Sequence, residues 1–245
     1  MKAWFLFVGL AGSAIAAGQP PPAVPRAPDG KPSLQGIWRV QNTADWDIQD
    51  HSPALGIPPG AGIVVGNEIP YQPWAAEKKK ENFKKRATAD PNSKCFLPGV
   101  PRVMYLPFPL QILQTPKYVV IASEYVHADR IIPLDGSAHP EDIDFWMGDS
   151  RGHWEGDTLV VDVRNFNDQT WFDRAGNFHS AELHVVERYN RTGPDTLRYE
   201  ATIEDPKVFT RPWKIATTLY RDTDKNAQIL EYDCFAYREP AGGAK

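Results

Sequence analysis

Two titratable residues interrupt apolar strand patterns in the second half of this 245-residue chain. Alternate residues of a strand share a face, so His127 lies on the same side of segment 118–129 as Tyr125. Glu187 shares a face with apolar residues of segment 183–189, and a buried carboxylate needs a partner because an unpaired internal charge is costly. We therefore predict that His127 and Glu187 form an acid/base couple. The alternative is a structural hydrogen bond inside the fold.

A second set of candidates lies in the polar segment 149–188. Asp173, His179 and His184 are expected to meet in loops at the mouth of the fold, where functional groups are commonly carried, and to act as acid and base. The same residue types also suit a metal, but His179 and His184 are five apart and would point to opposite faces of a strand. We therefore predict no metal site. A turn cap is the alternative role for Asp173.

Four further residues are predicted to bind and orient a substrate. They are Tyr125, Arg130, Trp171 and Arg188. The chain contains no Gly-x-Ser-x-Gly elbow, no phosphate-binding glycine loop, no His-Glu-x-x-His motif and no clustered cysteine pairs. We therefore expect chemistry that uses no cofactor.

The start of the chain has the layout of a secretory signal peptide. Lys2 precedes an apolar run over 3–15, and a small-x-small site stands at its end, Ala14–Ala16. We predict a signal peptide over 1–17 and a periplasmic or secreted protein. The alternative is a membrane anchor, but the apolar run is shorter than the ~20 residues that a bilayer requires.

Export gives a role to the only two cysteines, Cys95 and Cys234. An oxidising compartment favours a disulfide between them, which would tie the Pro-rich first half of the chain to the last predicted strand. Two buried free thiols are the alternative.

Composition restricts both the fold and the partners. The chain is 42% hydrophobic and 24% charged, as in globular proteins, and its 23 prolines disfavour long helices. Its net charge of -4 provides no basic footprint for nucleic acid, and no segment after the leader is apolar enough to span a membrane. The expected partner is a small apolar or aromatic molecule, because 8 Trp, 9 Tyr and 11 Phe suit a cavity for such a ligand.

Short runs rich in β-branched and aromatic residues predict an antiparallel sheet in the second half. The turns between them are too short for parallel crossovers. The pattern is clearest over 197–203, where apolar residues alternate with polar ones. The predicted strands are 33–40, 118–127, 130–134, 145–149, 158–163, 183–189, 197–203, 213–220 and 229–237, and one helix is predicted from Pro73 to about Ala87.

We predict an all-β fold, namely an antiparallel lipocalin- or calycin-like β-barrel with a Pro-rich N-terminal arm and one short helix. Closure into a barrel buries the edges of a meander of seven or eight strands. The domains are the signal peptide over 1–17, a Pro-rich tether over 18–32 and a single β-barrel domain over 33–240. Barrels of about eight strands can hold one small ligand.

Two sequence features resemble known families. Gly36-Ile37-Trp38 resembles the Gly-x-Trp motif that opens lipocalin-type barrels. The run 148–162, together with the segments 166–171, 186–188 and 205–213, resembles a large, mostly uncharacterised family of secreted bacterial β-rich proteins. This resemblance implies export, a bacterial source and a single β-rich domain, and it supplies no catalytic residues.

Together these observations predict an exported enzyme that acts on an apolar or aromatic small molecule by cofactor-independent acid/base chemistry, as an isomerase, lyase or hydratase. The alternative is a non-catalytic binding protein for a hydrophobic ligand. A third interpretation is a structural envelope protein whose interior is filled by its own side chains.

Overall fold

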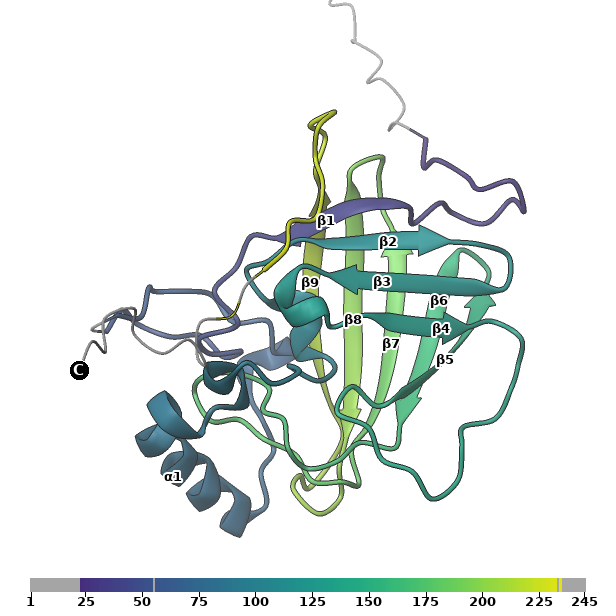
Figure 1. Ribbon diagram of the computed structural model, residues 1–245. Coiled ribbons are helices and arrows are strands. Elements are labelled where there is room, and N and C mark those ends of the chain that lie inside the picture. The colour runs from purple at the N-terminus through teal and green to yellow at the C-terminus, as the bar shows by residue number, and fades with distance from the viewer. Residues whose placement is uncertain (1–22, 55, 233, 235–245) are drawn as a thin grey trace, which may run out of the picture.

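Nine antiparallel strands form one sheet that curls into a nearly closed barrel (Figure 1). The structure is a computed structural model that describes residues 23–54, 56–232 and 234. The strand order is β4-β3-β2-β1-β9-β8-β7-β6-β5. The strands are β1 Gly36–Val40, β2 Leu110–Gln114, β3 Tyr118–Ser123, β4 Arg130–Pro133, β5 Asp149–Glu155, β6 Thr158–Arg164, β7 His184–Arg191, β8 Thr196–Glu204 and β9 Trp213–Arg221. The predicted all-β barrel is confirmed.

The barrel core follows from the alternation of apolar and polar residues along the strands. In β8, Leu197, Tyr199 and Ile203 are buried, whereas Arg198 between them is exposed. Leu197 pairs with Leu219 of β9, which is also buried. Because side chains alternate between the two faces of a strand, this register places every second residue inside the barrel.

The edge strands β4 and β5 meet along a seam that is closed by side chains. A Cβ added to Gly152 of β5 would lie 2.8 Å from Cγ2 of Ile132 and 2.7 Å from Cδ2 of Leu134, so a glycine is needed for this close approach. Further along the seam, Arg130 of β4 donates to Ser150 Oγ of β5 at 2.9 Å. At this seam β4 and β5 are therefore joined by side-chain contacts, in place of the backbone hydrogen bonds that join the other neighbouring strands.

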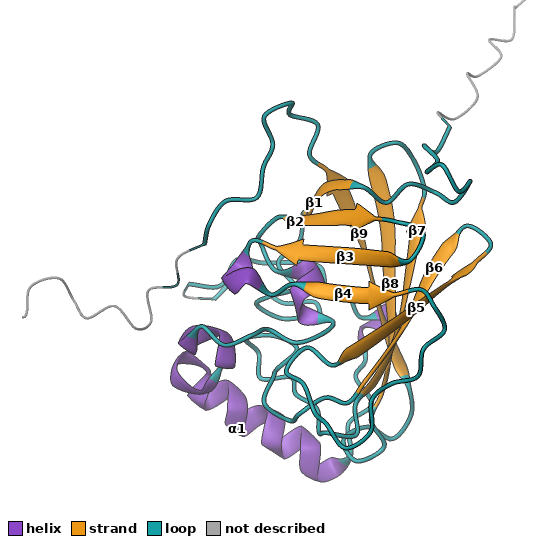
Figure 2. Ribbon diagram, turned by 45° about the vertical axis from the view of Figure 1, so that its right-hand side comes forward, coloured by secondary structure: helices purple, strands orange, loops and turns teal. Residues whose placement is uncertain are grey.

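Helix α1 (Pro73–Ala89) lies across one end of the barrel, together with several loops (Figure 2). Pro73 stands at the first helical position, as predicted, where its missing N–H is not needed. The helix contacts the loop at Gly176, because a Cβ there would lie only 2.7 Å from the backbone nitrogen of Phe83. The described residues also form the short 3₁₀ helices η1 Val65–Asn67, η2 Pro91–Lys94, η3 Arg102–Tyr105 and η4 Tyr125–His127.

Cys95 and Cys234 form a disulfide with their Cα atoms 5.9 Å apart. The predicted bridge is confirmed, and it indicates an oxidising compartment. The strand predicted over 229–237 is not seen at residues 229–232 or at Cys234, which have no regular structure. The other residues of the strand predicted over 229–237 lie outside the described part of the chain.

Two other strand predictions differ from the structure, and one strand is not predicted at all. The strand predicted over 118–127 ends at Ser123, because Val126 and His127 have left-handed φ angles of 44° and 51°. The strand predicted over 145–149 begins instead at Asp149 and runs to Glu155. The sequence does not predict β2, because the prolines around its five residues indicate a loop.

The N-terminal arm is described from residue 23 onward, and the predicted signal peptide lies outside the described residues. Arg26 donates two hydrogen bonds to the carboxylate of Asp157 in the turn between β5 and β6, at 2.7 and 2.6 Å. The arm is thus fastened to the barrel. Within the described ranges, no helix combines the length and apolar character needed to cross a bilayer.

Candidate functional site

Glu187 lies at the centre of a buried polar cluster inside the barrel. Arg130 donates from Nη2 to Glu187 Oε2 at 2.5 Å and from Nη1 to Oε1 at 3.1 Å. The hydroxyls of Tyr189 and Tyr199 donate to the same Oε1 at 2.9 and 2.8 Å. All four residues are at most 3% exposed. The carboxylate is therefore fully paired, as a buried charge must be.

The partners of Glu187 keep their protons at neutral pH. Burial, and then the negative charge of Glu187, raise the pKa of Tyr189 and of Tyr199 well above the ordinary value of 10.0. Burial alone would lower the pKa of Arg130, but the charge of Glu187 outweighs it and the pKa is raised. These groups fill the barrel centre, where the sequence predicts a ligand pocket. Glu187 therefore has the alternative role stated above, that of a structural hydrogen-bond acceptor inside the fold.

His127 does not reach Glu187, and the predicted acid/base couple is not formed. The left-handed φ angles at Val126 and His127 turn the chain out of the strand. His127 is exposed as a result, whereas Glu187 is completely buried. The prediction was wrong because it extended the alternation of β3 beyond Ser123, into the 3₁₀ helix η4.

Asp173, His179 and His184 do not meet at the mouth of the barrel either. Asp173 is buried and accepts hydrogen bonds from Ile48 N at 2.9 Å, from Asn177 N at 3.1 Å and from Asn177 Nδ2 at 2.5 Å. Burial, followed by the charge of Asp47, raises the pKa of Asp173 to about 7. Its hydrogen bonds make it a turn cap that fastens two loops together.

The two histidines have separate environments. His179 is buried with Nε2 2.7 Å from Thr170 Oγ1 and Nδ1 2.8 Å from the carbonyl oxygen of Ser180. Burial lowers the pKa of His179, so its ring is neutral at neutral pH. His184 instead lies on the outer face of β7, half-buried, and contacts carboxylates there. Neither ring faces a cleft that also holds Asp173.

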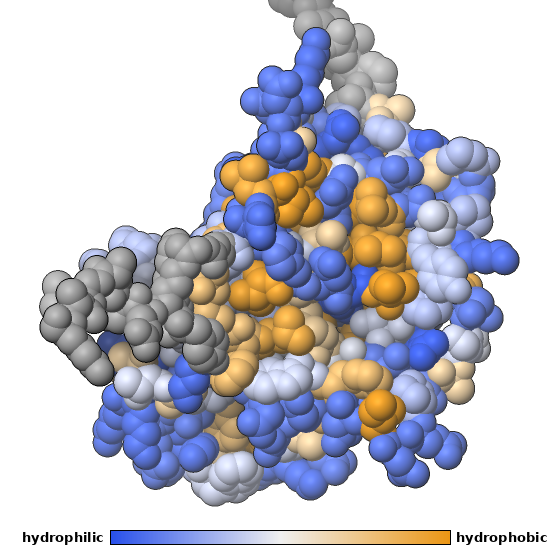
Figure 3. Space-filling view, in the orientation of Figure 1, coloured by the Kyte–Doolittle hydropathy of each residue, from blue (hydrophilic) through white to orange (hydrophobic). Residues whose placement is uncertain are grey.

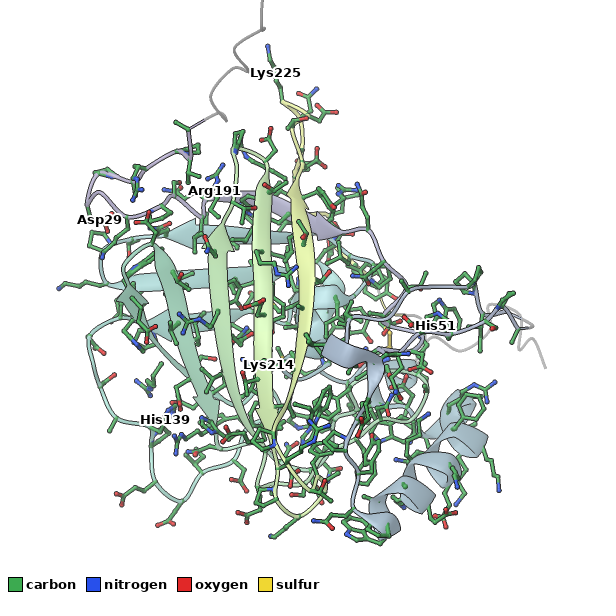
Figure 4. All side chains as sticks on the ribbon, turned by 180° about the vertical axis from the view of Figure 1, so that it is seen from behind. Asp29, His51, His139, Arg191, Lys214 and Lys225 are labelled. Atoms are coloured by element: carbon green, nitrogen blue, oxygen red, sulfur yellow. A yellow bond between two sulfur atoms is a disulfide. The ribbon has the colours of Figure 1, made fainter. Side chains whose placement is uncertain are left out.

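His184 belongs to a network of ion pairs on the outer face of the barrel. The same network includes His139, which Figure 4 labels. His139 lies 2.6 Å from Asp149 and 2.8 Å from Asp162. His184 lies 2.8 Å from the second oxygen of Asp162 and 3.3 Å from Glu204. The hydrogen bond to Asp162 raises the pKa of His184. Partial burial would raise the pKa of Asp162, but its hydrogen bonds, that to His184 first, lower it.

We expect the pair of His184 and Asp162 to stabilise the fold most at mildly acidic pH. The raised pKa of His184 makes its contribution complete below pH 6.5 and lost as the pH rises through the folded value. The lowered pKa of Asp162 makes its contribution present above pH 3.8 and lost as the pH falls through the folded value. His184→Gln should therefore lower the free energy of unfolding by about 1 kcal/mol near pH 5.5, and by much less near pH 9, in urea denaturation.

The matched control for this prediction is His153→Gln. His153 is an exposed histidine of β5 that lies 3.2 Å from Glu155. This variant should change the free energy of unfolding by no more than a few tenths of a kcal/mol at either pH. An effect of His184→Gln that does not depend on pH would contradict the assignment.

A cleft of about 430 Å³ lies at one end of the barrel, between α1, η2 and η4. Aromatic side chains, cations and two carboxylates share its wall. It is lined by Trp46, Phe108, Tyr125 and Tyr232, by Lys84, Arg86 and Arg174, by Asp45 and Asp90, and by Ala87, Asn92, Ser93 and Leu106. We call it the aromatic cleft. Of the residues predicted to bind substrate, Tyr125 is the one that lines it.

The aromatic side chains of the cleft pack against each other. The ring centroids of Phe108 and Tyr232 are 4.6 Å apart, and that of Tyr125 lies 5.3 Å from Phe108 and 5.4 Å from Tyr232. On another part of the wall, the guanidinium of Arg174 lies 4.5 Å from the ring centroid of Trp46. Such contacts hold large flat surfaces in place with little loss of conformational entropy on binding.

The disulfide holds Tyr232 at the cleft. Cys234, which follows Tyr232 by only two residues, is bridged to Cys95. Leu230 N also donates to Glu124 Oε2 at 2.8 Å. One wall of the cleft therefore comes from a segment that has no regular structure and is fixed at two points.

Arg102 of η3 binds the two carboxylates that line the cleft. It is 1% exposed and donates to Asp45 Oδ1 from Nε and Nη2 at 3.1 and 2.9 Å. It also donates to both oxygens of Asp90, at 2.8 and 2.9 Å. Arg174 Nε donates to the other oxygen of Asp45 at 2.8 Å. Bidentate pairing of this kind fixes the carboxylates in position.

Arg102 and Asp45 are both charged at neutral pH. Burial would lower the pKa of Arg102, but the charges of Asp45 and Asp90 raise it. Burial would raise the pKa of Asp45, but Arg102 and Arg174 lower it. Asp45 is therefore a poor base, because its pKa is lowered from the ordinary value of a carboxyl group.

The cleft combines an excess of positive charge with an aromatic surface. Arg102 compensates the two lining carboxylates in part, and three cations lie around them, although the whole chain carries a net charge of -4. Burial raises the pKa of Tyr125, and its hydroxyl donates to Asn92 O at 2.9 Å. The side-chain oxygen of Asn92 is buried and has no partner among the described residues. The cleft can thus hold an aromatic anion that also offers a hydrogen-bond donor.

The other residues predicted to bind substrate lie elsewhere. Arg130 is inside the barrel with Glu187. Trp171 is half-buried and pairs through its backbone with Phe178. Arg188 lies on the outer face of β7, 2.9 Å from Glu155. These three predictions relied on alternation or on loop position, and neither shows which loops come together in space.

Sequence analysis missed Trp46, Arg102 and Arg174. Trp46 and Arg174 come from loops and Arg102 from the short 3₁₀ helix η3, and none of these segments has a periodic pattern that marks them. In the described part of the chain, no group of three or more His, Cys, Asp or Glu side chains is arranged to hold a metal ion. No protein-family model, no curated protein and no solved structure matches the chain.

Proposed function

We propose that the protein binds a small aromatic anion in the aromatic cleft without transforming it. The single observation that carries this proposal is the composition of the cleft wall, in which aromatic rings and cations face a space of about 430 Å³. This volume lies within the range of small-molecule sites. The proposal takes up the binding-protein alternative and adds the charge of the ligand.

Binding is favoured over catalysis by where the predicted acids and bases lie. Glu187 and Asp173 are buried and fully hydrogen-bonded, and His184 is paired on the outer face. An enzyme of the expected kind needs an acid and a base within reach of one substrate. The carboxylates that line the cleft are instead bound to Arg102.

The disulfide and the predicted signal peptide support a periplasmic or secreted location. An exported binding protein meets its ligand outside the reducing cytoplasm, where Cys95 and Cys234 remain paired and Tyr232 stays in place. The Gly36-Ile37-Trp38 motif supports a lipocalin-like relationship, since Trp38 of β1 is completely buried in the barrel.

We expect 2-naphthoate to bind in the aromatic cleft with a Kd of about 100 µM, and its neutral methyl ester, which like the carboxylate has no hydrogen-bond donor, to bind about tenfold more weakly. Arg174→Ala should weaken binding of 2-naphthoate about tenfold, because it removes both a cation and the partner of Trp46. Isothermal titration calorimetry measures the three affinities. In Arg174→Ala the free energy of unfolding should fall by no more than about 1 kcal/mol, because Arg174 is half-exposed and such ion pairs contribute little to stability.

Arg198→Ala is the matched control for this experiment. Arg198 is a half-exposed arginine on β8 that pairs with Glu200, and it does not line the cleft. Its replacement should leave the affinity for 2-naphthoate unchanged. Equal binding of 2-naphthoate and its methyl ester, or equal loss in the two arginine variants, would count against the proposal. Native mass spectrometry of the protein from its own source would identify a ligand that purifies with it.

A further inference from the structure

A second cleft lies where the seam between β4 and β5 opens. Its volume is about 370 Å³, and it shares no lining residue with the aromatic cleft. Strand β4 begins there at Arg130 and β5 at Asp149. The lining consists of Leu97, Asp129, Arg130, Ile131, Asp144, Phe145, Trp146, Met147, Gly148, Asp149 and Ser150. We call it the seam cleft.

Two buried hydrogen-bond donors line the seam cleft. Arg130 is 3% exposed, and its Nη1 and Nη2 atoms are used by Glu187, Tyr189 and Ser150. Its Nε–H has no hydrogen-bond partner among the described residues. Ser150 is 6% exposed and accepts from Arg130 Nη2 at 2.9 Å, so its own proton is free to be donated. Buried donors normally have acceptors, and two that line one cleft indicate a site for an oxygen atom.

The other residues that line the seam cleft indicate which kind of molecule carries this oxygen atom. Leu97, Phe145, Trp146 and Met147 are apolar, and the Trp146 ring centroid lies 5.1 Å from that of Phe96. Figure 3 shows hydrophobic patches on the surface of this face of the molecule. Ile131 of β4, which lines the seam cleft, and Leu113 of β2, two strands away, are exposed.

Charge excludes an anion from the same site. Glu187 already neutralises Arg130 through a bidentate pair. Asp129 and Asp144, which are exposed, and Asp149 line the cleft as well, so the local charge is negative. A carboxylate would be repelled by these groups, whereas a neutral carbonyl oxygen accepts the same two hydrogen bonds.

We propose that the seam cleft binds a small uncharged aromatic molecule through a carbonyl oxygen, which accepts from Arg130 Nε and Ser150 Oγ. The aromatic part lies against Trp146 and Phe145. The site differs from the aromatic cleft in its charge preference, and it does not depend on the function proposed for that cleft.

The test is a titration of the disulfide-bonded, ¹⁵N-labelled protein with acetophenone, a neutral aromatic ketone, followed by ¹H–¹⁵N correlation spectra. We expect the Arg130 Nε–H and the Trp146 indole N–H resonances to shift and to saturate at up to about 20 mM ketone, the weak affinity of a fragment. Benzoate at the same concentration should leave both resonances in place. Ser150→Ala should weaken the binding of acetophenone about three- to tenfold, the value of one neutral hydrogen bond.

The control is Ser93→Ala, because Ser93 lines the aromatic cleft and not the seam cleft. It should leave the binding of acetophenone unchanged. The proposal is overturned if neither resonance moves, which would mean that water alone satisfies the donors. It is also overturned if benzoate binds as well as the ketone, or if Ser150→Ala binds the ketone like the parent. The spectra of the parent protein decide the first two outcomes without any variant.

Discussion

Replacing Arg102 by alanine should lower the free energy of unfolding by about 3–5 kcal/mol and abolish binding of 2-naphthoate. Arg102 donates to two carboxylates, Asp45 and Asp90, that are 5% and 3% exposed. Without the guanidinium, the two buried carboxylates in the wall of the cleft are no longer bridged by a positive charge. Stability should fall because Asp90 loses its charged partner and Asp45 keeps only Arg174. Binding should fall because the positive charge at the cleft decreases and the two carboxylates, no longer held by Arg102, repel an anion.

Urea denaturation and calorimetric titration measure the two effects. Arg102→Lys keeps the charge but cannot donate to both carboxylates in the same geometry, so it should show an intermediate loss of stability. Arg39→Ala is the matched control, because Arg39 pairs with Asp222 at a half-exposed site on β1 and should cost no more than about 1 kcal/mol. If Arg102→Ala were as stable as this control, the assignment of Arg102 as the support of the cleft would be wrong.

Glu187→Gln should also destabilise the protein by about 3–5 kcal/mol, without any change of side-chain size. The amide removes the only negative charge that faces Arg130 in the barrel cluster, and one of its N–H groups would point toward the Arg130 donors. The hydroxyls of Tyr189 and Tyr199 keep an acceptor only if the amide oxygen stays at the Oε1 position. The loss of stability therefore measures the charge and not the packing.

A double-mutant cycle separates these contributions. Arg130→Met and Glu187→Leu should each be strongly destabilising, whereas the double variant should recover part of the loss, because an apolar pair leaves no unpaired charge. The two tyrosine hydroxyls would then lack their acceptor, at about 1–3 kcal/mol each, so recovery should remain incomplete. Fully additive losses would show that Arg130 and Glu187 do not stabilise each other. Binding of 2-naphthoate should persist in each folded variant, since neither residue lines the aromatic cleft.

Two of the buried arginines, Arg130 and Arg102, stabilise different parts of the fold. Arg130 and its partners fill the centre of the barrel, where barrels of this size can otherwise hold a ligand. Arg102 pairs with carboxylates of the loops at the end of the barrel, where the aromatic cleft lies. The barrel thus acts as a rigid scaffold, and its terminal loops form the proposed binding site.

Much of the fold could be predicted from local patterns. The alternation over 197–203 predicts β8, and the proline at position 73 predicts the start of α1, because both depend on neighbours in sequence. The two cysteines pair as expected, since the chain offers only one pairing. β2 and β5 are the exceptions. Flanking prolines hide the first, and in the second Gly152 interrupts the apolar face because Ile132 and Leu134 occupy its side-chain space.

The candidate site could not be predicted in the same way. Alternation correctly indicates that Glu187 faces inward, but its partner is Arg130, 57 residues away, and not His127. The choice depended on where β3 ends, and two left-handed residues decide this. Arg102, Asp45 and Asp90 come from segments with no shared period, and their pairing follows from how the loops pack.

The amino-acid sequence by itself therefore determined the β-barrel, its one long helix and the disulfide, because periodicity, turn residues and a single cysteine pair act locally or without competitors. Only the tertiary structure decided which ionisable groups face each other, which of them are buried and where a ligand fits. Those properties depend on distances between residues that are far apart in the chain, and electrostatic energies and desolvation change steeply with such distances.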